Sequence, residues 1–446
     1  MQLFSIHPYE WSLRPPLRAV LFLLALGLSA FFLSIEVLRV GVADTLAMSH
    51  DPAELRRAVN LDPDNAQVHR LLGSFLCTLE DPHMAEGLGH LRRATQLSPN
   101  QAINWSALAS ACELAGDNAC ADEAFERALR VAPMVPRSEW AAANHYLVTD
   151  RTDQALAHFE HLLKMDPGYD WQTFRLCVRA TGDPDLVFQK VVAPLTDTAL
   201  NLSYLAFLSS QGEMAAAGRV WSATVAHASP FPLSSTQPYL GRLLQLGQGR
   251  EALRVWQDLE RIGVVEKSAR EDPDNLVFNG GFEEPPLDQG LDWRSLSAPY
   301  LFVDFADKAA HSGNRCLRID FTVPRNEEFL ATFQFVPVAP AQEYVLRAFA
   351  RSQNITSDSG PRLRVLDAAC PSCVDASSDM TVGTTPWHEI SLKFSTGTDT
   401  QLLEIFVVRG KSRNFPMEIS GTFWLDDVTL KALGPADHTD SLKRAH

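Results

Sequence analysis

The chain has 446 residues, of which 46% are hydrophobic and 21% are charged. A chain of this length and composition can bury the cores of two or three domains. Aspartate and glutamate outnumber lysine and arginine by 54 to 39, which gives a formal net charge of -15. Because no basic excess is available to neutralise phosphates, the composition argues against a nucleic-acid partner.

An uncharged apolar segment lies near the N-terminus. Residues 19–35 carry no charge, and Val37 and Leu38 extend the segment beyond Glu36. Such a segment is just long enough to cross a bilayer as a helix. A cleaved signal peptide is the alternative, but the segment is long for one and no distinct small-x-small cleavage motif follows it. We expect an uncleaved transmembrane helix over 19–38.

The charges on either side of this segment indicate its orientation. Arg14 and Arg18 precede it, and the positive-inside tendency places them in the cytoplasm. The asymmetry is small, because Arg39 and two further arginines follow the segment. We expect a single-pass protein of the inner (cytoplasmic) membrane, with a cytoplasmic tail at 1–18 and the bulk of the chain in the periplasm or otherwise outside the cytoplasm.

Seven cysteines bear on the compartment. Their odd number excludes a fully paired disulfide framework. Two pairs are close in sequence and would suit an oxidising compartment. For Cys112 and Cys120, a disulfide and two buried thiols are both open. For Cys370 and Cys373, in the motif CPSC, we expect a loop disulfide, because there is neither a second CxxC for zinc nor a thioredoxin-like context.

Residues 50–268 contain a repeat. Pro63, Pro99, Pro133 and Pro167 are spaced by 36, 34 and 34 residues, and each follows alanines and large apolar residues at helical spacing. Small residues at that spacing let two antiparallel helices approach closely. The period and the residue types resemble the tetratricopeptide repeat (TPR), a 34-residue helix–turn–helix unit. The resemblance implies six or seven units stacked into a right-handed solenoid.

One unit shows the pattern most fully. Its residues are Trp105, Leu108, Ala109 and Cys112 on the first helix, Gly116 at the turn, and Ala121, Phe125 and Ala128 on the second. Upstream, Leu55, Ala58 and Pro63 resemble the second helix of a half repeat that lies against the membrane segment. The period breaks at 182–194, where Pro194 would interrupt a helix, and then returns.

The resemblance to TPR proteins implies a concave groove that binds a protein or peptide. A spacer that holds the C-terminal part away from the membrane is the alternative. Within this half, His158 and His161 have the i, i+3 spacing of a metal pair. No further ligand stands at a fitting distance in the sequence, so we expect a solvated helix face there.

After a polar linker at 266–272, the periodicity changes from 3.6 to 2 residues. Short segments rich in aromatic and branched residues read as strands. They are 327–338, 343–352, 361–368, 387–396, 401–410 and 421–433. Six to nine strands in this space predict an antiparallel β-sandwich, a jelly roll, over 274–433, followed by a polar tail at 434–446. The whole chain is then a multidomain α + β protein.

The ends of this region carry a second resemblance. The residues that carry it are NLVFNGGFEEP at 275–285, Trp293, HSGNRCLRID at 311–320, Trp387 and FWLDDVTL at 423–430. Their order is similar to that of carbohydrate-binding modules of the galactose-binding-like jelly-roll group. The resemblance covers about 275–432 and implies the fold. It also implies a candidate glycan-binding module, although such modules serve as spacers or protein-binding domains too.

The same group often holds a structural calcium near these ends. Gly280 and Gly281 permit a tight turn, after which Glu283 should stand beside the final strand with Asp426 and Asp427. Carboxylates that converge repel each other unless a cation joins them, and oxygen ligands suit Ca²⁺. We expect a structural Ca²⁺ site there; solvated strand ends are the alternative.

A glycan site needs aromatic platforms and planar polar groups. Trp293, Trp387 and Trp424 coincide with framework positions, so we expect them in the core. Arg347 and Arg351 share a face of their strand, and arginines on an inner sheet face would suit an acidic polysaccharide. We expect ordinary solvated arginines and keep both as glycan-binding candidates. The remaining glycan-binding candidates are Gln334, Arg409, Tyr300 and Phe302.

The sequence lacks the motifs of the common enzyme classes. It has no G-x-S-x-G, H-E-x-x-H, G-x-x-x-x-G-K-S/T or G-x-G-x-x-G. We therefore expect a non-catalytic, membrane-anchored adaptor that recruits proteins through its repeats and contacts glycan through its jelly roll. The combination resembles accessory proteins of bacterial polysaccharide synthesis and secretion. The alternatives are a purely structural assembly subunit and, less favoured, a cryptic enzyme.

Overall fold

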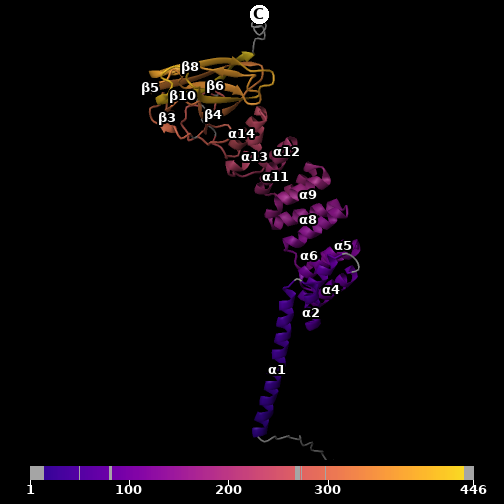
Figure 1. Cartoon of the computed structure of the whole chain (residues 1–446). Helices are drawn as coiled ribbons and strands as arrows, with labels where there is room; N and C mark the ends of the chain where they lie inside the picture. The colour runs from indigo at the N-terminus through magenta and orange to yellow at the C-terminus, as the bar shows by residue number, and fades with distance from the viewer. Residues whose placement is uncertain are drawn as a thin grey trace, which may run out of the picture. The chain divides into compact units, whose positions relative to one another are not determined.

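The computed structural model describes residues 15–49, 51–79, 83–266, 272, 274–296 and 298–435 (Figure 1). Within this part of the chain, fourteen α-helices precede ten β-strands, which confirms the predicted multidomain α + β class. The chain divides into two compact units, Met1–Leu195 and Thr196–His446. The predicted tails at 1–18 and 434–446 and the linker at 266–272 fall mostly outside the described residues, as do the side chains of Arg14 and Arg18.

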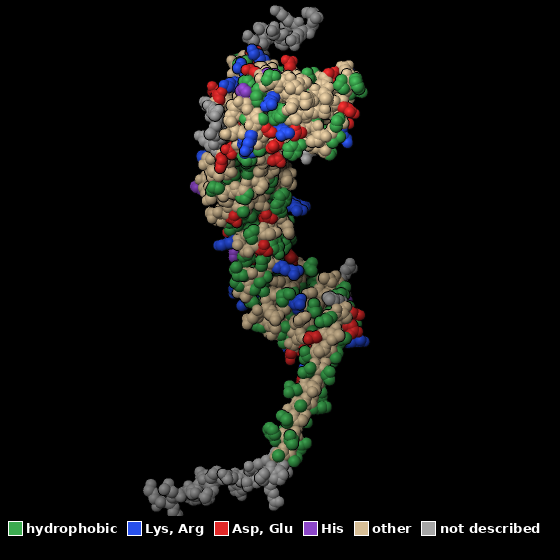
Figure 2. Space-filling view, turned by 90° about the vertical axis from the view of Figure 1, so that its left-hand side faces the viewer, with side chains coloured by type: hydrophobic (Ala, Val, Ile, Leu, Met, Phe, Trp, Pro, Cys, Tyr) green, Lys and Arg blue, Asp and Glu red, His purple; other side chains and the backbone are tan. Residues whose placement is uncertain are grey.

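A long helix, α1 (Pro15–Ala47), opens the first unit. Between Val20 and Val42 its large apolar side chains are exposed, and Figure 2 shows hydrophobic groups along its length. From residue 19 on, the helix is long and apolar enough to cross a membrane, a test that a signal sequence also passes. Its C-terminal end is different, because Ala43 and Ala47 are only 0% and 5% exposed.

The buried end of α1 belongs to the first repeat. The other main helices of this unit are α2 (Pro52–Leu61), α3 (Ala66–Cys77), α4 (Met84–Leu97), α5 (Ala102–Leu114), α6 (Asn118–Val131), α7 (Pro136–Val148), α8 (Thr152–Met165) and α9 (Asp170–Thr181). Ala43 and Ala47 share one hydrophobic core with Leu55 of α2 and Leu72 of α3. The half repeat expected beside the membrane segment is therefore present, and the end of α1 is its first helix.

The helix pairs follow the proline period. Pro63, Pro99, Pro133 and Pro167 each lie two residues after the last residue of α2, α4, α6 and α8. Small residues let the two helices of a pair approach, as expected: a Cβ atom at Gly73 of α3 would lie 2.8 Å from the carbonyl oxygen of Gly87 in α4.

The pattern fails where the sequence predicts that it should. After α9 the chain forms a single helical turn, α10 (Pro184–Val187), a π-helical turn at Phe188–Val192 and a 3-10 turn at Ala193–Leu195. The boundary between the two compact units follows directly, after Leu195.

The second unit joins four helices to the sandwich. The helices are α11 (Thr198–Gln211), α12 (Met214–Val225), α13 (Gln237–Gln245) and α14 (Gly249–Arg261). The Trp256 ring of α14 meets Phe278 at 5.4 Å, edge to face. Side chains at Gly290 and Gly249 would overlap Trp256 and the backbone of Gln401. The last helices are thus packed on the sandwich rather than separated from it by a spacer.

The sandwich has two five-stranded antiparallel sheets, ordered β1-β4-β9-β6-β7 and β2-β3-β10-β5-β8. The strands are β1 (Arg294–Ser295), β2 (Leu301–Asp307), β3 (Cys316–Arg325), β4 (Phe329–Pro337), β5 (Gln342–Ile355), β6 (Arg362–Asp367), β7 (Asp375–Ser377), β8 (Gly383–Ser395), β9 (Leu402–Arg409) and β10 (Ile419–Pro435). All six expected strand segments are strands. The count exceeds the predicted six to nine because β1 and β7 are only two and three residues long.

The core of the sandwich lies between the two sheets. Phe282 and Trp293 are both 0% exposed there, and their rings meet at 5.2 Å. The opening motif at 275–285 therefore contributes a core residue, Phe282, and the Val428 amide donates to the Gly280 carbonyl at 2.9 Å. Its glycines serve a close approach, since a Cβ atom at Gly280 would overlap the carbonyl oxygen of Val428.

Candidate functional site

The outer face of sheet β2-β3-β10-β5-β8, the side away from the core, carries a row of polar and aromatic side chains. Pairing registers place Asp304 beside Arg318, Arg318 beside Trp424, and Trp424 beside Arg351. Burial alternates along β5, so that even-numbered residues from 344 to 350 face the core and Arg351 faces outward. Side chains from four strands therefore meet in one line across this face.

Trp424 lies between two guanidinium groups. The Arg318 group is 6.0 Å from its ring centre and the Arg351 group is 4.8 Å away. These contacts leave Trp424 only 6% exposed, although it belongs to the outer face and not to the core where we expected it. Arg318 is also bound by Asp307 at 3.1 Å and Asp320 at 2.9 Å. The row is a cation–aromatic stack.

A second aromatic group adjoins the row. The His311 ring stacks on Phe349 at 3.6 Å and meets Trp387 edge-on at 5.7 Å. Its Nδ1 atom is 2.6 Å from a carboxylate oxygen of Asp427. Trp387 is half-buried, so it is neither a core residue nor a fully open platform.

The structure places four glycan candidates on or beside this outer face. Arg347 and Arg351 share a face of β5, as predicted, and it is the outer face, in line with the expectation of ordinary solvated arginines rather than arginines on an inner sheet face. Arg347 is 3.6 Å from the Glu389 carboxylate. Phe302 is 54% exposed, whereas Tyr300 is half-buried against the core with Arg325 5.8 Å from its ring.

Gln334 does not face solvent, so it is no glycan contact. Its side chain is 0% exposed. The amide nitrogen donates to the Phe278 carbonyl at 2.7 Å, and the amide oxygen accepts from the Phe278 amide at 3.2 Å. Gln334 therefore joins β4 to the segment that begins the sandwich. Its neighbours Phe333 and Phe335 take the outward positions.

Arg409 is likewise structural, which corrects its assignment as a glycan contact. It is 0% exposed at the end of β9. Its guanidinium donates to the carbonyls of Ser359, Glu327 and Met417 at 2.6 to 2.9 Å. Weaker contacts to Asn326 and Ser357 complete its set of partners. A guanidinium offers five N–H donors, and here they tie three loops together.

The predicted calcium ligands accept hydrogen bonds from a neighbouring loop. Glu283 accepts from the backbone amides of Asn314 and Arg315 at 2.8 and 3.0 Å. Asp426 accepts from the His311 amide at 2.7 Å. Burial raises the pKa of Asp426 to about 6, and the charge of Asp427 acts in the same direction. The carboxylates thus hold the loop at 311–315.

This arrangement does not by itself form a metal site. Among the described residues, no group of three or more His, Cys, Asp or Glu side chains is placed to hold a metal ion. N–H donors already fill carboxylate oxygens that a cation would need. Calcium at Glu283, Asp426 and Asp427 therefore stays a prediction that rests on the sequence resemblance.

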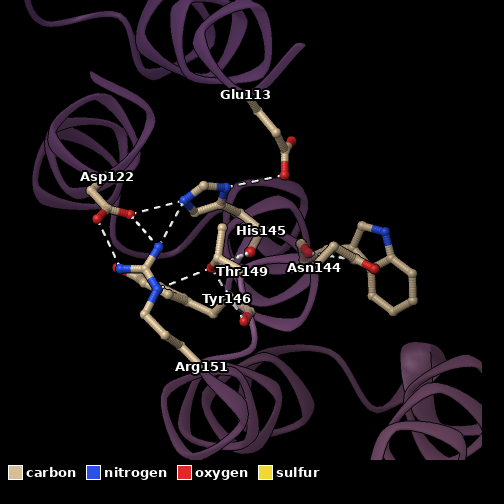
Figure 3. A network of polar contacts seen from close by, with 8 residues as sticks. Glu113, Asp122, Asn144, His145, Tyr146, Thr149 and Arg151 are labelled. Carbon is tan, nitrogen blue, oxygen red and sulfur yellow. Dashed lines mark hydrogen bonds and ion pairs between the residues drawn. The ribbon is translucent and has the colours of Figure 1, made fainter. Parts of the chain in front are cut away.

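In the repeats, a buried histidine connects neighbouring units (Figure 3). His145 of α7 is 0% exposed, with Nδ1 3.1 Å from Glu113 and Nε2 2.8 Å from Asp122. Arg151 binds the same Asp122 through two nitrogens, at 2.8 and 2.7 Å, and lies 4.6 Å from the Tyr146 ring. The hydrogen bond from Arg151, together with that from His145, lowers the pKa of Asp122.

His158 and His161 do not form the expected solvated face, because each is hydrogen-bonded to Glu139. Both Nδ1 atoms lie 2.7 Å from the carboxylate of Glu139, which is only 3% exposed. Burial alone would raise the pKa of Glu139, but the two histidines outweigh it and the pKa is lowered. The contact of the two histidines with Glu139 could not be predicted from the sequence, because Glu139 lies on the preceding helix.

The repeat period does contain a sequence signal for ion pairs between neighbouring units. Ion pairs join Arg56 to Glu86, Arg93 to Asp64 and Arg151 to Asp122. Their separations are 30, 29 and 29 residues. Opposite charges that stand a little less than one repeat apart therefore face each other across neighbouring units.

Both close cysteine pairs are disulfides in the structure, Cys112–Cys120 and Cys370–Cys373. The first joins α5 to α6 beside Glu113 and Asp122, the two partners of His145. Cys77, Cys177 and Cys316 are free and buried.

The second unit contains a cavity of about 740 Å³ between α12 and α14. Its lining includes Arg219, Tyr239, Glu251, Arg254 and, from the sandwich, Gln401. Tyr239 is only 4% exposed, and burial raises the pKa of its hydroxyl to about 12. The cavity offers both charges and an apolar floor, as a bound peptide would require.

No protein-family model and no curated protein matches the chain. Similar solved structures include the crystal structure of the MamA protein, at 17% identity and a TM-score of 0.30, over 36% of this chain and 91% of that one. A structure described as "CBM4 structure and function" matches at 16% identity and a TM-score of 0.26, over 35% and 99%. CBM22-1–GH10 modules of xylanase 10B from Clostridium thermocellum, complexed with xylohexaose, match at 18% and 0.25, over 36% and 29%. Each likeness concerns one part of the chain only.

Proposed function

We propose that the chain is a non-catalytic adaptor, anchored by α1 in the inner membrane, with its repeats and jelly roll in the periplasm. The repeats recruit a protein partner, and the jelly roll contacts glycan, in the assembly or export of a cell-envelope polysaccharide. The alternative, a purely structural assembly subunit, has the same anchor and repeats but no glycan contact.

The observation that carries the anchor is the buried end of α1. Ala43 and Ala47 complete the core that Leu55 and Leu72 form in the first repeat. Cleavage at or beyond Ala43 would remove these side chains from the core and expose apolar groups to water, and cleavage before Ala43 would cut a helix that runs unbroken from Pro15 to Ala47. A segment that the folded domain needs is better explained as a retained anchor.

Three features support the compartment and the partners. Disulfides at Cys112–Cys120 and Cys370–Cys373 persist in oxidising compartments such as the periplasm. The cavity between α12 and α14 provides a place for a peptide segment of a partner protein. The outer face with Trp424 and Arg351 provides aromatic and planar polar groups for a glycan.

Reporter fusions test the anchor and its orientation. Alkaline phosphatase, which is active only outside the cytoplasm, is fused after Pro435 in the full chain. We expect high phosphatase activity in the membrane fraction and none from the same reporter fused before residue 15. Activity of the N-terminal fusion, or recovery of the C-terminal fusion in the soluble fraction, would contradict the proposal.

A further inference from the structure

The arginines on the outer face of sheet β2-β3-β10-β5-β8 differ in their partners. Arg318 is neutralised by Asp307 and Asp320, and Arg347 by Glu389. Arg351, by contrast, makes no hydrogen bond or ion pair with any residue that the structure describes; its contact is the Trp424 ring. A guanidinium that lies over an aromatic ring keeps its N–H donors free at its edge. Arg351 is therefore a cation of this face without an anion.

Tryptophans stand on both sides of Arg351. Trp424 is its neighbour on β10. Ala350 pairs with His388 of β8 and Ser352 pairs with Thr385, so a β-bulge places two residues, one of them Trp387, opposite Arg351. Trp387 is half-buried and keeps part of its ring open.

Trp424 adds a polar group without a partner. Its indole nitrogen is buried and makes no hydrogen bond in the described part of the chain. A buried donor left unsatisfied is costly. If a ligand displaced the Arg351 guanidinium from the ring, a ligand oxygen could accept the hydrogen bond of the Trp424 indole N–H. Binding would then recover the free energy that the unsatisfied donor costs.

Acidic side chains also lie on this face. Asp304 and Asp307 belong to β2 and Asp320 to β3, and Arg318 pairs with the last two. On β10, Asp426 and Asp427 follow Trp424 and are bound by the amide and the ring of His311. Towards β8, Glu389 pairs with Arg347. An anionic ligand would therefore meet an unpaired cation at Arg351.

We propose that Arg351, Trp387 and Trp424 form a binding site for a glycan that carries carboxylates. The guanidinium fork pairs with a uronate carboxylate, and the Trp387 ring packs on the C–H face of a sugar ring. This proposal specifies the class of ligand for the glycan contact in the proposed function, and it rests on that proposed function. Within the described residues no acidic group pairs with the Arg351 guanidinium, which leaves it available for the ligand.

Binding of defined oligosaccharides to the full chain in lipid nanodiscs tests the site. The probes are hexagalacturonate and hexamannuronate, with methyl-esterified hexagalacturonate and mannohexaose as neutral counterparts. We expect the acidic probes to bind and the neutral ones to bind at least about tenfold more weakly. Arg351→Gln should lower the affinity for acidic probes about tenfold or more, and Arg351→Lys by less, because lysine keeps the charge but loses the fork.

Arg347→Gln is the matched control, since it removes the same charge from the same face of the same strand. It should change affinity by less than about threefold, because Glu389 already neutralises Arg347. The thermal midpoint of each variant shows that the sandwich is folded. Equal effects at Arg347 and Arg351, or equal binding of polyglutamate, would overturn the site. Neutral probes that bind independently of Arg351 would overturn this inference while keeping the glycan contact; silence of every probe would overturn both.

Discussion

The repeats and the sandwich bury polar side chains in different ways. In the repeats, His145 and Glu139 are surrounded by ionisable side chains that come from neighbouring helices. In the sandwich, Arg409 and Gln334 are surrounded by backbone groups of loops and strand ends. Side-chain partners can change protonation, whereas carbonyls cannot. The two regions should therefore respond differently to mutation and to pH.

The largest effect should come from the sandwich, at Arg409. Arg409→Met keeps the side-chain bulk but leaves the carbonyls of Ser359, Glu327 and Met417 buried without donors. We expect a loss of about 4 kcal/mol in the free energy of unfolding, measured by urea denaturation in detergent. Arg413→Met, at an exposed position four residues on, should change it by less than about 0.5 kcal/mol. Similar values for the two variants would contradict the structural role of Arg409.

The joint between α1 and the first repeat should be nearly as sensitive. Ala43→Asp places a charge in the core shared with Leu55 and Leu72, and we expect a loss of about 3 kcal/mol. Val42→Asp is the control, because Val42 is 48% exposed on the same helix. Hydrogen exchange of peptides from α2 and α3 measures the local loss. Protection that is unchanged in Ala43→Asp would show that α1 does not complete this repeat.

Removal of the buried histidine should have a smaller effect. His145→Ala deletes the link between Glu113 and Asp122, but Arg151 still binds Asp122. We expect a loss of about 2 kcal/mol, with faster hydrogen exchange in α6 and α7. Asn144→Ala, which removes only a hydrogen bond to the Trp140 carbonyl, should cost less than about 1 kcal/mol. Equal losses would mean that the network contributes little.

The two regions should respond to acid with opposite signs. The pKa of Asp122 and Glu139 is lowered, so their stabilisation of the repeats is present above about pH 4 and is lost as pH falls through the folded values. Burial raises the pKa of Asp292 and Asp426 to about 6, so their contribution to the sandwich is present below about pH 4 and is lost as pH rises through 6.

Hydrogen exchange at pH 7, 5 and 3, corrected for intrinsic rates, measures this difference. Between pH 7 and 5 we expect β10 to gain about 1 kcal/mol of protection while α7 and α8 stay constant; below pH 4 the helices should lose protection. Asp426→Asn should remove the gain in β10, and Glu139→Gln part of the acid loss in α8. If hydrogen-exchange protection changed in the same direction in both regions, the predicted difference between them would be wrong.

The smallest effect should be that of calcium removal. Because loop amides already fill the oxygens of Glu283 and Asp426, we expect chelation to move the thermal midpoint of the sandwich by less than about 1 °C. A larger shift that added Ca²⁺ reverses would establish the metal site predicted from the sequence.

Much of the fold could be predicted because it depends on local periods. The proline spacing located the helix pairs, and alternation located the long strands and the shared face of Arg347 and Arg351. Strands as short as β1 and β7 leave no period to detect. The motif at 275–285, together with Trp293, correctly indicated a jelly roll, since Phe282 and Trp293 are core residues.

The partners of polar residues could not be predicted, because they depend on contacts between distant segments. Gln334 is buried by a segment 56 residues earlier in the sequence, and Arg409 by loops up to 83 residues away. Trp424 looked like a core position, but its place between two arginines follows from the register of three strands. Glu139 became visible as a partner of His158 and His161 only when α7 and α8 were packed together.

The intact mass of the protein extracted from membranes tests the anchored adaptor most directly. If α1 is a retained anchor, the mature chain keeps residues 19–47 and remains in the membrane fraction after washing with alkaline carbonate. We predict a single species whose mass includes all of α1. A soluble species that begins within or after α1, and is as stable as the membrane-bound chain, would contradict the account.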